Sequence, residues 1–362
     1  MFRISTATST NHARCGVLKL PHGEVRTPAF MPVGTQGTVK TVGSDDLEGL
    51  GFEIILANTY HLALRPGADV IERMGGLNRF MSWKKPILTD SGGFQVMSLG
   101  AIREIDDDGV TFKSHLDGSS MRLTPEESIR IQSQLGVDVS MALDVCPPFP
   151  AERDEVAGAM RRTHLWAPRN LTARREGQAV FGIVQGGVYE DLRDESLNVI
   201  TSLPFDGFAI GGVSVGEPTE LQRPVVQRTA PRLPRDKVRY LMGVGHPQDI
   251  IHAVKCGVDL FDCVLPTRMA RHHALYTMKG IANLTNKKWE EHDGPVDEAS
   301  MFPQTERYSA AYLRHLFKAK EPLGARIATL HNLAFYARLM ADIRSAIEQD
   351  QWPELEYKYA DA

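Results

Sequence analysis

Apolar runs of strand length recur along the chain, and most of them are continuous rather than alternating with polar residues. Segments with helical spacing of apolar residues separate many of these runs. A strand that is apolar at nearly every position is typical of a parallel sheet with both faces covered. The eight runs are 28–33, 53–58, 86–90, 138–144, 180–186, 207–212, 240–245 and 260–265.

Eight strand–helix units predict an α/β fold of the (β/α)8 TIM-barrel class. A doubly wound open sheet is the alternative architecture for such units. We expect one domain over residues 1–362, with three segments outside the repeat. These segments are an N-terminal hairpin that turns at His22-Gly23, an antiparallel insertion at 100–123 after the third strand, and a larger insertion at 270–308 after the eighth strand, followed by a helical C-terminus.

Composition narrows the class of protein. Hydrophobic residues make up 42% of the 362 residues, which suits a large buried core. The formal net charge is -4, so binding to a nucleic acid has to use a local basic surface. We expect no membrane span and no signal peptide, because neither pattern is present. The 4 cysteines do not resemble a disulfide framework, and a cytoplasmic, reduced protein is the expectation.

Polar residues fall at the ends of several predicted strands. In a barrel these ends share one rim, so their side chains are expected to converge there. A single aspartate at such a position is equally well explained as a cap of the next helix. Three aspartates with an amide and paired glycines favour a ligand site. The residues are Asp90, Asp144, Gln185 and Asp262, with the glycine pairs 186–187 and 211–212.

This set of groups suits a planar ligand that is rich in hydrogen-bond donors. Guanine fits, because one carboxylate can accept from its N1–H and N2–H2 groups together. Phe94 and Met242 are candidates to sandwich such a base. The alternative is that both are core residues. The pattern favours the core for Met242, whereas Phe94 lies in a glycine-rich stretch that predicts a loop.

A basic cluster follows Asp262 directly, beginning with Arg268 and Arg271 and continuing into His272 and His273. Such clusters are usually a solvated face of the protein. Beside a carboxylate at a strand end, they also predict contacts to the phosphates of a reacting nucleotide.

Seven ordered motifs resemble the bacterial-type tRNA-guanine transglycosylase family, and the resemblance covers nearly the whole chain. It implies exchange, without ATP, of guanine at the wobble position of tRNAs with a GUN anticodon for a 7-substituted 7-deazaguanine, either 7-aminomethyl-7-deazaguanine or queuine, on the route to queuosine. The motifs are LANTYHLALRPG (56–67), TDSGGFQVMSL (89–99), GIVQGGVYEDLR (182–193), GFAIGGVSVGEP (207–218), YLMGVGHP (240–247), DLFDCVLPTR (259–268) and the C-terminal stretch 308–332.

The resemblance also implies roles for individual residues. Asp262 falls on the nucleophile that forms a covalent ribosyl-enzyme, and Asp90 falls on the general acid/base. The base-recognition positions are Asp144, Gln185 and the backbone of Gly212 and Val213, and the stacking pair is Phe94 and Met242. The positions that contact tRNA are Arg268 and Arg271. Val33 and Val215 fall on positions that border the 7-substituent.

Several positions depart from the family pattern. Val145 stands where a glutamate is usual, and Met269 where an asparagine is usual. The family's structural zinc site has three cysteines and one histidine, and the matching residues here are Ser300, Phe302, Thr305 and His331. We therefore predict no cofactor, no zinc and a degenerate zinc subdomain formed by 270–308 and the following helices. Either residues 301–303 fill the site as an apolar plug, or 297–307 is a disordered loop.

Two other functions compete with base exchange. A non-catalytic partner subunit of a transglycosylase is disfavoured because Asp262 and Asp90 are both present. A glycosidase with two carboxylates is disfavoured by the basic segment beside Asp262 and by the lack of a tryptophan at a strand end. The family resemblance implies a homodimer, although the zinc region that contributes contacts is altered.

Overall fold

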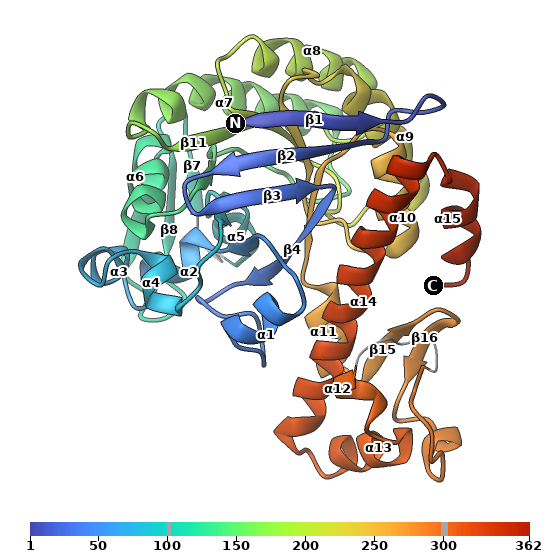
Figure 1. The fold of residues 1–362 in the computed structure, drawn as a ribbon. Helices are drawn as coiled ribbons and strands as arrows, with labels where there is room; N and C mark the ends of the chain where they lie inside the picture. The colour runs from blue at the N-terminus through green and yellow to red at the C-terminus, as the bar shows by residue number, and fades with distance from the viewer. Residues whose placement is uncertain (100–102, 298–302) are drawn as a thin grey trace.

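The computed structural model describes residues 1–99, 103–297 and 303–362, and its centre is a closed barrel of parallel strands (Figure 1). All eight predicted strands are present, and β14 closes the barrel by pairing with β4, with Asp262 opposite Met31. The closed barrel confirms the (β/α)8 class and rules out the open sheet. The strands are β4 Ala29–Gly34, β5 Ile55–Ala57, β6 Ile87–Thr89, β10 Val139–Met141, β11 Ala179–Val184, β12 Gly207–Ile210, β13 Val238–Leu241 and β14 Leu260–Cys263.

Most of these strands are shorter than the apolar runs that predicted them. The run 138–144 contains only the three hydrogen-bonded residues of β10, so Asp144 lies in the following loop rather than at the strand end. Ala142 and Leu143 continue the run because they are buried under the outer helices, although they lie beyond the strand. An apolar run in the sequence indicates buried positions, and buried positions continue beyond the last residue that is hydrogen-bonded to a neighbouring strand.

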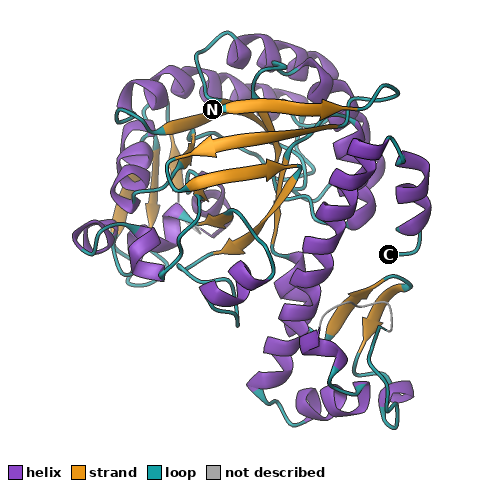
Figure 2. Ribbon diagram, in the orientation of Figure 1, coloured by secondary structure: helices purple, strands orange, loops and turns teal. Residues whose placement is uncertain are grey.

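Helices surround the barrel and cover the outer faces of its strands (Figure 2). The long C-terminal helix α14 packs against α11 and β4, beside the closing strand. No helix in the described ranges is both long and apolar enough to cross a membrane. The helices are α1 Ser44–Gly49, α2 Thr59–Leu64, α3 Ala68–Arg73, α4 Leu77–Met81, α5 Gly93–Leu99, α6 Pro125–Leu135, α7 Arg153–Ala173, α8 Glu190–Thr201, α9 Thr219–Thr229, α10 Pro247–Lys255, α11 Leu265–Arg271, α12 Pro303–Glu306, α13 Ala310–Lys318, α14 Pro322–Gln349 and α15 Trp352–Lys358.

A three-stranded antiparallel sheet closes the N-terminal mouth of the barrel. The predicted hairpin is confirmed as β2 (Arg14–Leu20) and β3 (Gly23–Thr27), but β1 (Phe2–Ala7) was not predicted. Half of the residues of β1 are exposed, so it lacked the continuous apolar run used to find strands. Leu18 and Val25 of this sheet join the apolar cluster inside the barrel. The opposite, C-terminal mouth is left for ligands.

Both predicted insertions contain antiparallel strands. The first forms a sheet of β7 (Arg103–Ile105), β8 (Val110–Lys113) and β9 (Ser120–Leu123), while residues 100–102 of the predicted insertion lie outside the described ranges. After β14, the hairpin of β15 (Ala274–Thr277) and β16 (Gly280–Asn283) packs with α13 and the start of α14 around a separate apolar cluster. The barrel and this smaller unit are seen at the centre and the bottom of Figure 1.

Candidate active site

The C-terminal rim of the barrel brings the predicted carboxylates together. Asp90 follows β6 directly, Asp144 lies in the loop after β10, and Asp262 is the third residue of β14. The charge of Asp262 raises the pKa of Asp90, and the charge of Asp90 raises the pKa of Asp144. The three acids follow or end strands of the same closed barrel, so they share its C-terminal rim.

Asp262 is held by two donors on the same oxygen. Its Oδ1 accepts a hydrogen bond from the Tyr240 hydroxyl at 2.5 Å and another from the Gly243 N–H at 2.8 Å. Burial raises the pKa of Asp262, and these two hydrogen bonds oppose the rise because they stabilise the ionised carboxylate. Within the described ranges, Oδ2 accepts no hydrogen bond and is available to react.

Tyr240 was not recognised as a site residue from the sequence. It lies in β13 inside the barrel and is almost fully buried. Burial and the neighbouring Asp262 raise the pKa of Tyr240 well above its ordinary value, so the hydroxyl keeps its proton and serves as a donor. The available signal was strand alternation, because Tyr240 and Met242 are two residues apart and side chains at that spacing share a face.

Asp90 is buried in a set of backbone and amide donors. The Thr59 N–H donates to its Oδ1 at 2.9 Å, the Gly92 N–H donates at 3.2 Å, and the Asn58 side chain donates to Oδ2. Burial nevertheless raises the pKa of Asp90 to about 6, with a further contribution from Asp262. A carboxyl group with such a pKa can both give and take a proton near neutral pH. The sequence motif contained Asn58 and Thr59 but did not indicate this role.

Asp144 and Gln185 form the third part of the site. Gln185 Nε2 donates to Asp144 Oδ2 at 2.6 Å, and burial raises the pKa of Asp144 to about 6. Gly212 has a φ of 66°, and a Cβ there would collide with the Gln185 amide, which explains the glycine. Val213 follows and is buried. Two predicted recognition residues, Asp144 and Gln185, are therefore in direct contact.

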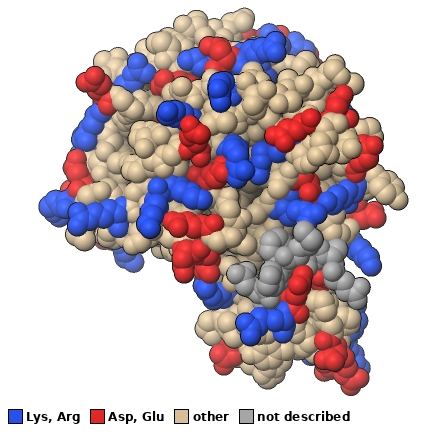
Figure 3. All heavy atoms as spheres, in the orientation of Figure 1, with Lys and Arg blue, Asp and Glu red and all other residues tan. Residues whose placement is uncertain are grey.

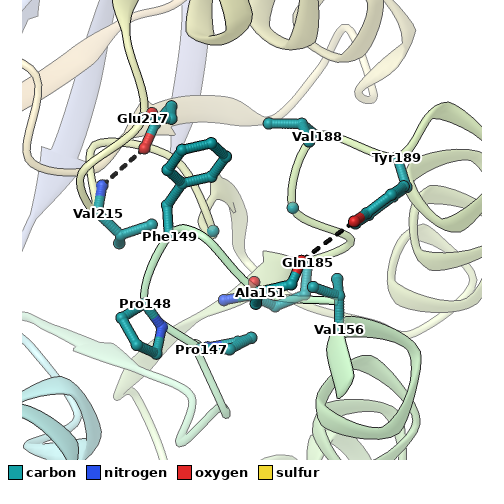
Figure 4. A pocket seen from close by; sticks show the side chains of 12 residues that line it. Pro147, Pro148, Phe149, Ala151, Val156, Gln185, Val188, Tyr189, Val215 and Glu217 are labelled. Carbon is teal, nitrogen blue, oxygen red and sulfur yellow. Dashed lines mark hydrogen bonds between the residues drawn. The ribbon is translucent and has the colours of Figure 1, made fainter. Parts of the chain in front are cut away.

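Gln185 and Gly212 also line a pocket beside this contact (Figure 4). Phe149 and Tyr189 form part of its wall, and the Tyr189 hydroxyl donates to the Ala151 carbonyl at 3.1 Å. Beside Phe149 and across the pocket from Tyr189, Glu217 accepts a hydrogen bond from the Val215 N–H at 2.9 Å and holds that loop in place.

The structure corrects one expectation about the predicted stacking pair, Phe94 and Met242, because it places Phe94 in a helix. Phe94 lies in the first turn of α5 rather than in a loop, and Ser91 Oγ accepts a hydrogen bond from the Gly93 N–H at 3.2 Å at the start of that helix. The Phe94 side chain is 48% exposed, which is unusual for a phenylalanine and leaves its ring accessible to a ligand. Met242 is only partly buried and packs against the apolar cluster inside the barrel.

Arg268 and Arg271 lie on α11, which begins directly after β14, and both side chains are exposed. Among the described residues, neither forms an ion pair with an acidic side chain. Over the face drawn in Figure 3, basic and acidic side chains are mixed, in agreement with the net charge of -4. The unpaired arginines are therefore a local cationic feature next to the rim.

The residues at the family's zinc positions do not fit a zinc ion. His331 is buried, and its Nε2 donates to the Tyr276 carbonyl at 2.8 Å. Thr305 is buried and offers a hydroxyl rather than a thiolate. Ser300 and the predicted plug residues 301–302 lie outside the described ranges. In residues 1–99, 103–297 and 303–362, no three His, Cys, Asp or Glu side chains are grouped so as to hold a metal.

Comparisons with a family model and with known proteins all find similarity to the same family. A model of the family described as Queuine tRNA-ribosyltransferase matches residues 9–362. The Queuine tRNA-ribosyltransferase of Herpetosiphon aurantiacus is 53% identical over 352 residues, covering 97% of this chain and 90% of that protein. The protein of the same name from Halothermothrix orenii is 52% identical over 339 residues, covering 93% and 91%. That of Natranaerobius thermophilus is 50% identical over 362 residues, covering 99% and 98%.

The buried Asp144 carboxylate should reduce stability at neutral pH. Because the pKa of Asp144 is raised to about 6 from 3.8, the folded state binds more protons than the unfolded state between these values, and stability falls as the pH rises through that window. We expect Asp144→Asn to stabilise the protein by about 1–3 kcal/mol at pH 7.5 and to have little effect near pH 4. Urea unfolding at both pH values measures this. An equal effect at the two pH values would contradict the assigned pKa.

Proposed function

The chain belongs to the queuine tRNA-ribosyltransferase family, and we propose that Asp262 is the nucleophile of its reaction. The protein is a pentosyltransferase that exchanges guanine in tRNA in queuosine biosynthesis. Family membership leaves the non-catalytic subunit and the glycosidase without support. The observation that carries the proposal is the anchoring of Asp262, in which one oxygen is held by Tyr240 and Gly243 while the other accepts no hydrogen bond from the part of the chain that the structure describes.

In the proposed reaction, Asp262 Oδ2 attacks C1′ of the ribose while the glycosidic bond to guanine breaks. The bonding electrons leave with the base, and a covalent ester between Asp262 and the ribose remains. Tyr240 and Gly243 keep their hydrogen bonds to Oδ1, which becomes the ester carbonyl oxygen. They stabilise the carboxylate again when the ester is cleaved.

Asp90 is the proposed general acid and base. As an acid, it protonates the ring nitrogen of the departing guanine, which avoids release of an anionic base. As a base, it then takes the ring N–H proton of the incoming 7-deazaguanine, whose nitrogen attacks C1′ and releases Asp262. The pKa of about 6 supports both roles, since neither protonation state of Asp90 is strongly disfavoured near neutral pH.

The incoming and outgoing bases are proposed to bind between Phe94 and Met242. Asp144 accepts from N1–H and N2–H2 of the base, and Gln185 with the backbone of Gly212 and Val213 completes the recognition. The exposed ring of Phe94 and the contact of Gln185 with Asp144 support this arrangement. The base must leave the anticodon stack to reach the rim, which costs less in a loop than in a duplex.

Replacing the nucleophile tests the central proposal. We expect Asp262→Ala to abolish exchange of radiolabelled guanine into unmodified tRNA while the far-UV circular dichroism stays unchanged. Denaturing gels should show a covalent enzyme–tRNA adduct for the wild type and none for Asp262→Ala. Tyr240→Phe is the matched variant, since it keeps the nucleophile and removes one anchor. An adduct in Asp262→Ala would assign the nucleophile to another residue.

The preferred incoming base is proposed to be 7-aminomethyl-7-deazaguanine rather than queuine. Val33 is buried in β4, and Val215 lines the pocket beside Gln185. Branched side chains at both positions favour a small 7-substituent over a large one. Competition between the two bases for the same tRNA measures the preference, and a higher kcat/KM for queuine would overturn it.

The proposed tRNA surface includes Arg268 and Arg271. Both are exposed on α11 next to the nucleophile. We expect the double variant Arg268→Gln/Arg271→Gln to weaken tRNA binding and to lower the slope of log K against log salt by roughly two phosphate contacts. Arg73→Gln, on the exposed face of α3, is the control. An unchanged slope would place the tRNA on another surface.

We propose that the protein folds and works without zinc, with 270–308 and the following helices as a degenerate zinc subdomain. Apolar packing in this part of the chain, around Leu284, Trp289 and Leu313, supports stability without a metal. Structural zinc contributes strongly to folding where it is present. Metal analysis of protein purified without chelator or histidine tag should find no stoichiometric zinc. Zinc at one ion per chain, lost on chelation together with thermal stability, would refute the proposal.

A second copy of the chain is the remaining proposed partner.

A further inference from the structure

Arg193 is a buried cation that the proposed mechanism leaves unused. It lies in the first half of α8 and is 2% exposed. Its Nε donates to the Gly187 carbonyl at 2.7 Å, and its Nη1 donates to the Val184 carbonyl at 3.1 Å. Among the described residues, its Nη2 has no hydrogen-bond partner. A buried guanidinium with an unused donor is costly to the fold, which suggests that the donor serves a purpose.

The Nη2 group of Arg193, which has no hydrogen-bond partner among the described residues, lies near the base-recognition amide. A Cβ added to Gly212 would lie 3.1 Å from Arg193 Nη2 and would collide with Gln185 Oε1. The guanidinium and the oxygen of the Gln185 amide therefore border the same small space beside Gly212. On its other side, the same amide donates from Nε2 to Asp144 at 2.6 Å. One neutral amide thus lies between a buried anion and a buried cation.

We infer that Asp144 and Arg193 together fix which way the Gln185 amide points. In the observed orientation, the NH2 group faces the carboxylate and the oxygen lies on the side of the guanidinium. A rotation by 180° would set the oxygen against the carboxylate and the NH2 group against the guanidinium. Both arrangements would be repulsive, and the repulsion is strong because Asp144, Gln185 and Arg193 are all buried.

This orientation makes Arg193 a specificity-determining, positioning residue, and the argument rests on the proposed function. Guanine presents two donors, N1–H and N2–H2, and one acceptor, O6, along one edge. When Asp144 accepts from the two donors, the fixed NH2 group of Gln185 meets O6. The bound base then competes with Gln185 for Asp144, so Arg193 becomes the main group that holds the amide. The site consequently selects a strong acceptor at position 6 of the base.

The test distinguishes recognition of the group at position 6 of the base from recognition of its N2 amino group. Guanine, 6-thioguanine and hypoxanthine are measured as competitors for incorporation of radiolabelled guanine into tRNA. 6-Thioguanine keeps both donors but replaces O6 with sulfur, a weak acceptor. Hypoxanthine keeps O6 and lacks the N2 amino group, so it reports on Asp144. The wild type should prefer guanine over both analogues.

In Arg193→Met, we expect the preference for guanine over 6-thioguanine to fall by about tenfold and the preference for guanine over hypoxanthine to stay within about twofold. Arg228→Met is the matched control, because it removes an exposed arginine that pairs with Asp194 of α8, and it should change neither ratio. A general loss of packing would move both ratios together. An unchanged 6-thioguanine ratio in an active Arg193→Met would overturn the inference.

If Arg193→Met does not fold, Arg193→Gln serves in its place, because its amide can still donate to the carbonyls of Val184 or Gly187 without a charge. The same fall in the 6-thioguanine ratio is expected, and its absence would be equally decisive against the inference. Failure of the proposed function looks different. In that case the wild type itself would incorporate no guanine, whereas failure of the inference leaves the wild-type exchange intact.

Discussion

Removal of three carboxylates from water at one rim of a closed barrel is the constraint on which the rest of this site depends. Burial raises the pKa of Asp90, Asp144 and Asp262, and it is the largest cause of the shift in each case. Each acid is therefore surrounded by donors that offset part of that cost. The loops after the strands supply most of these donors, and the large barrel core provides the stability that such a site requires.

The hydrogen-bond donors are arranged differently around Asp262 and Asp90, and the roles proposed for the two acids follow from this difference. Asp262 is only partly buried, and both of its donors among the described residues bind one oxygen, which leaves the other oxygen for the proposed attack. Asp90 is more deeply buried, lies near the charge of Asp262 and has a pKa of about 6, which suits proton transfer. The different surroundings of two chemically identical side chains thus support the different roles proposed for them, attack by Asp262 and proton transfer by Asp90.

The proposed recognition of the base uses two buried charges that do not pair with each other. Gln185 Nε2 donates to Asp144, and Gln185 Oε1 lies near the Arg193 guanidinium, so we infer that the two charges together orient the amide toward the ligand. A direct ion pair would have neutralised both charges and left nothing to orient the amide. The proposed binding of the much larger tRNA uses a different kind of contact, because the exposed arginines of α11 would act through solvent and their contribution would fall with salt.

The sequence by itself determined the barrel, its eight strands and the polar residues that meet at its rim, because continuous apolar runs and strand-end polar residues are local patterns. Its ordered motifs also identified the family. Only the tertiary structure decided that Tyr240, far from Asp262 in the chain, anchors that carboxylate, and that Asn58 and Thr59 hold Asp90. It also decided that Arg193 faces Gln185, since hydrogen-bond direction and burial arise between elements and leave no periodic signal within any one of them.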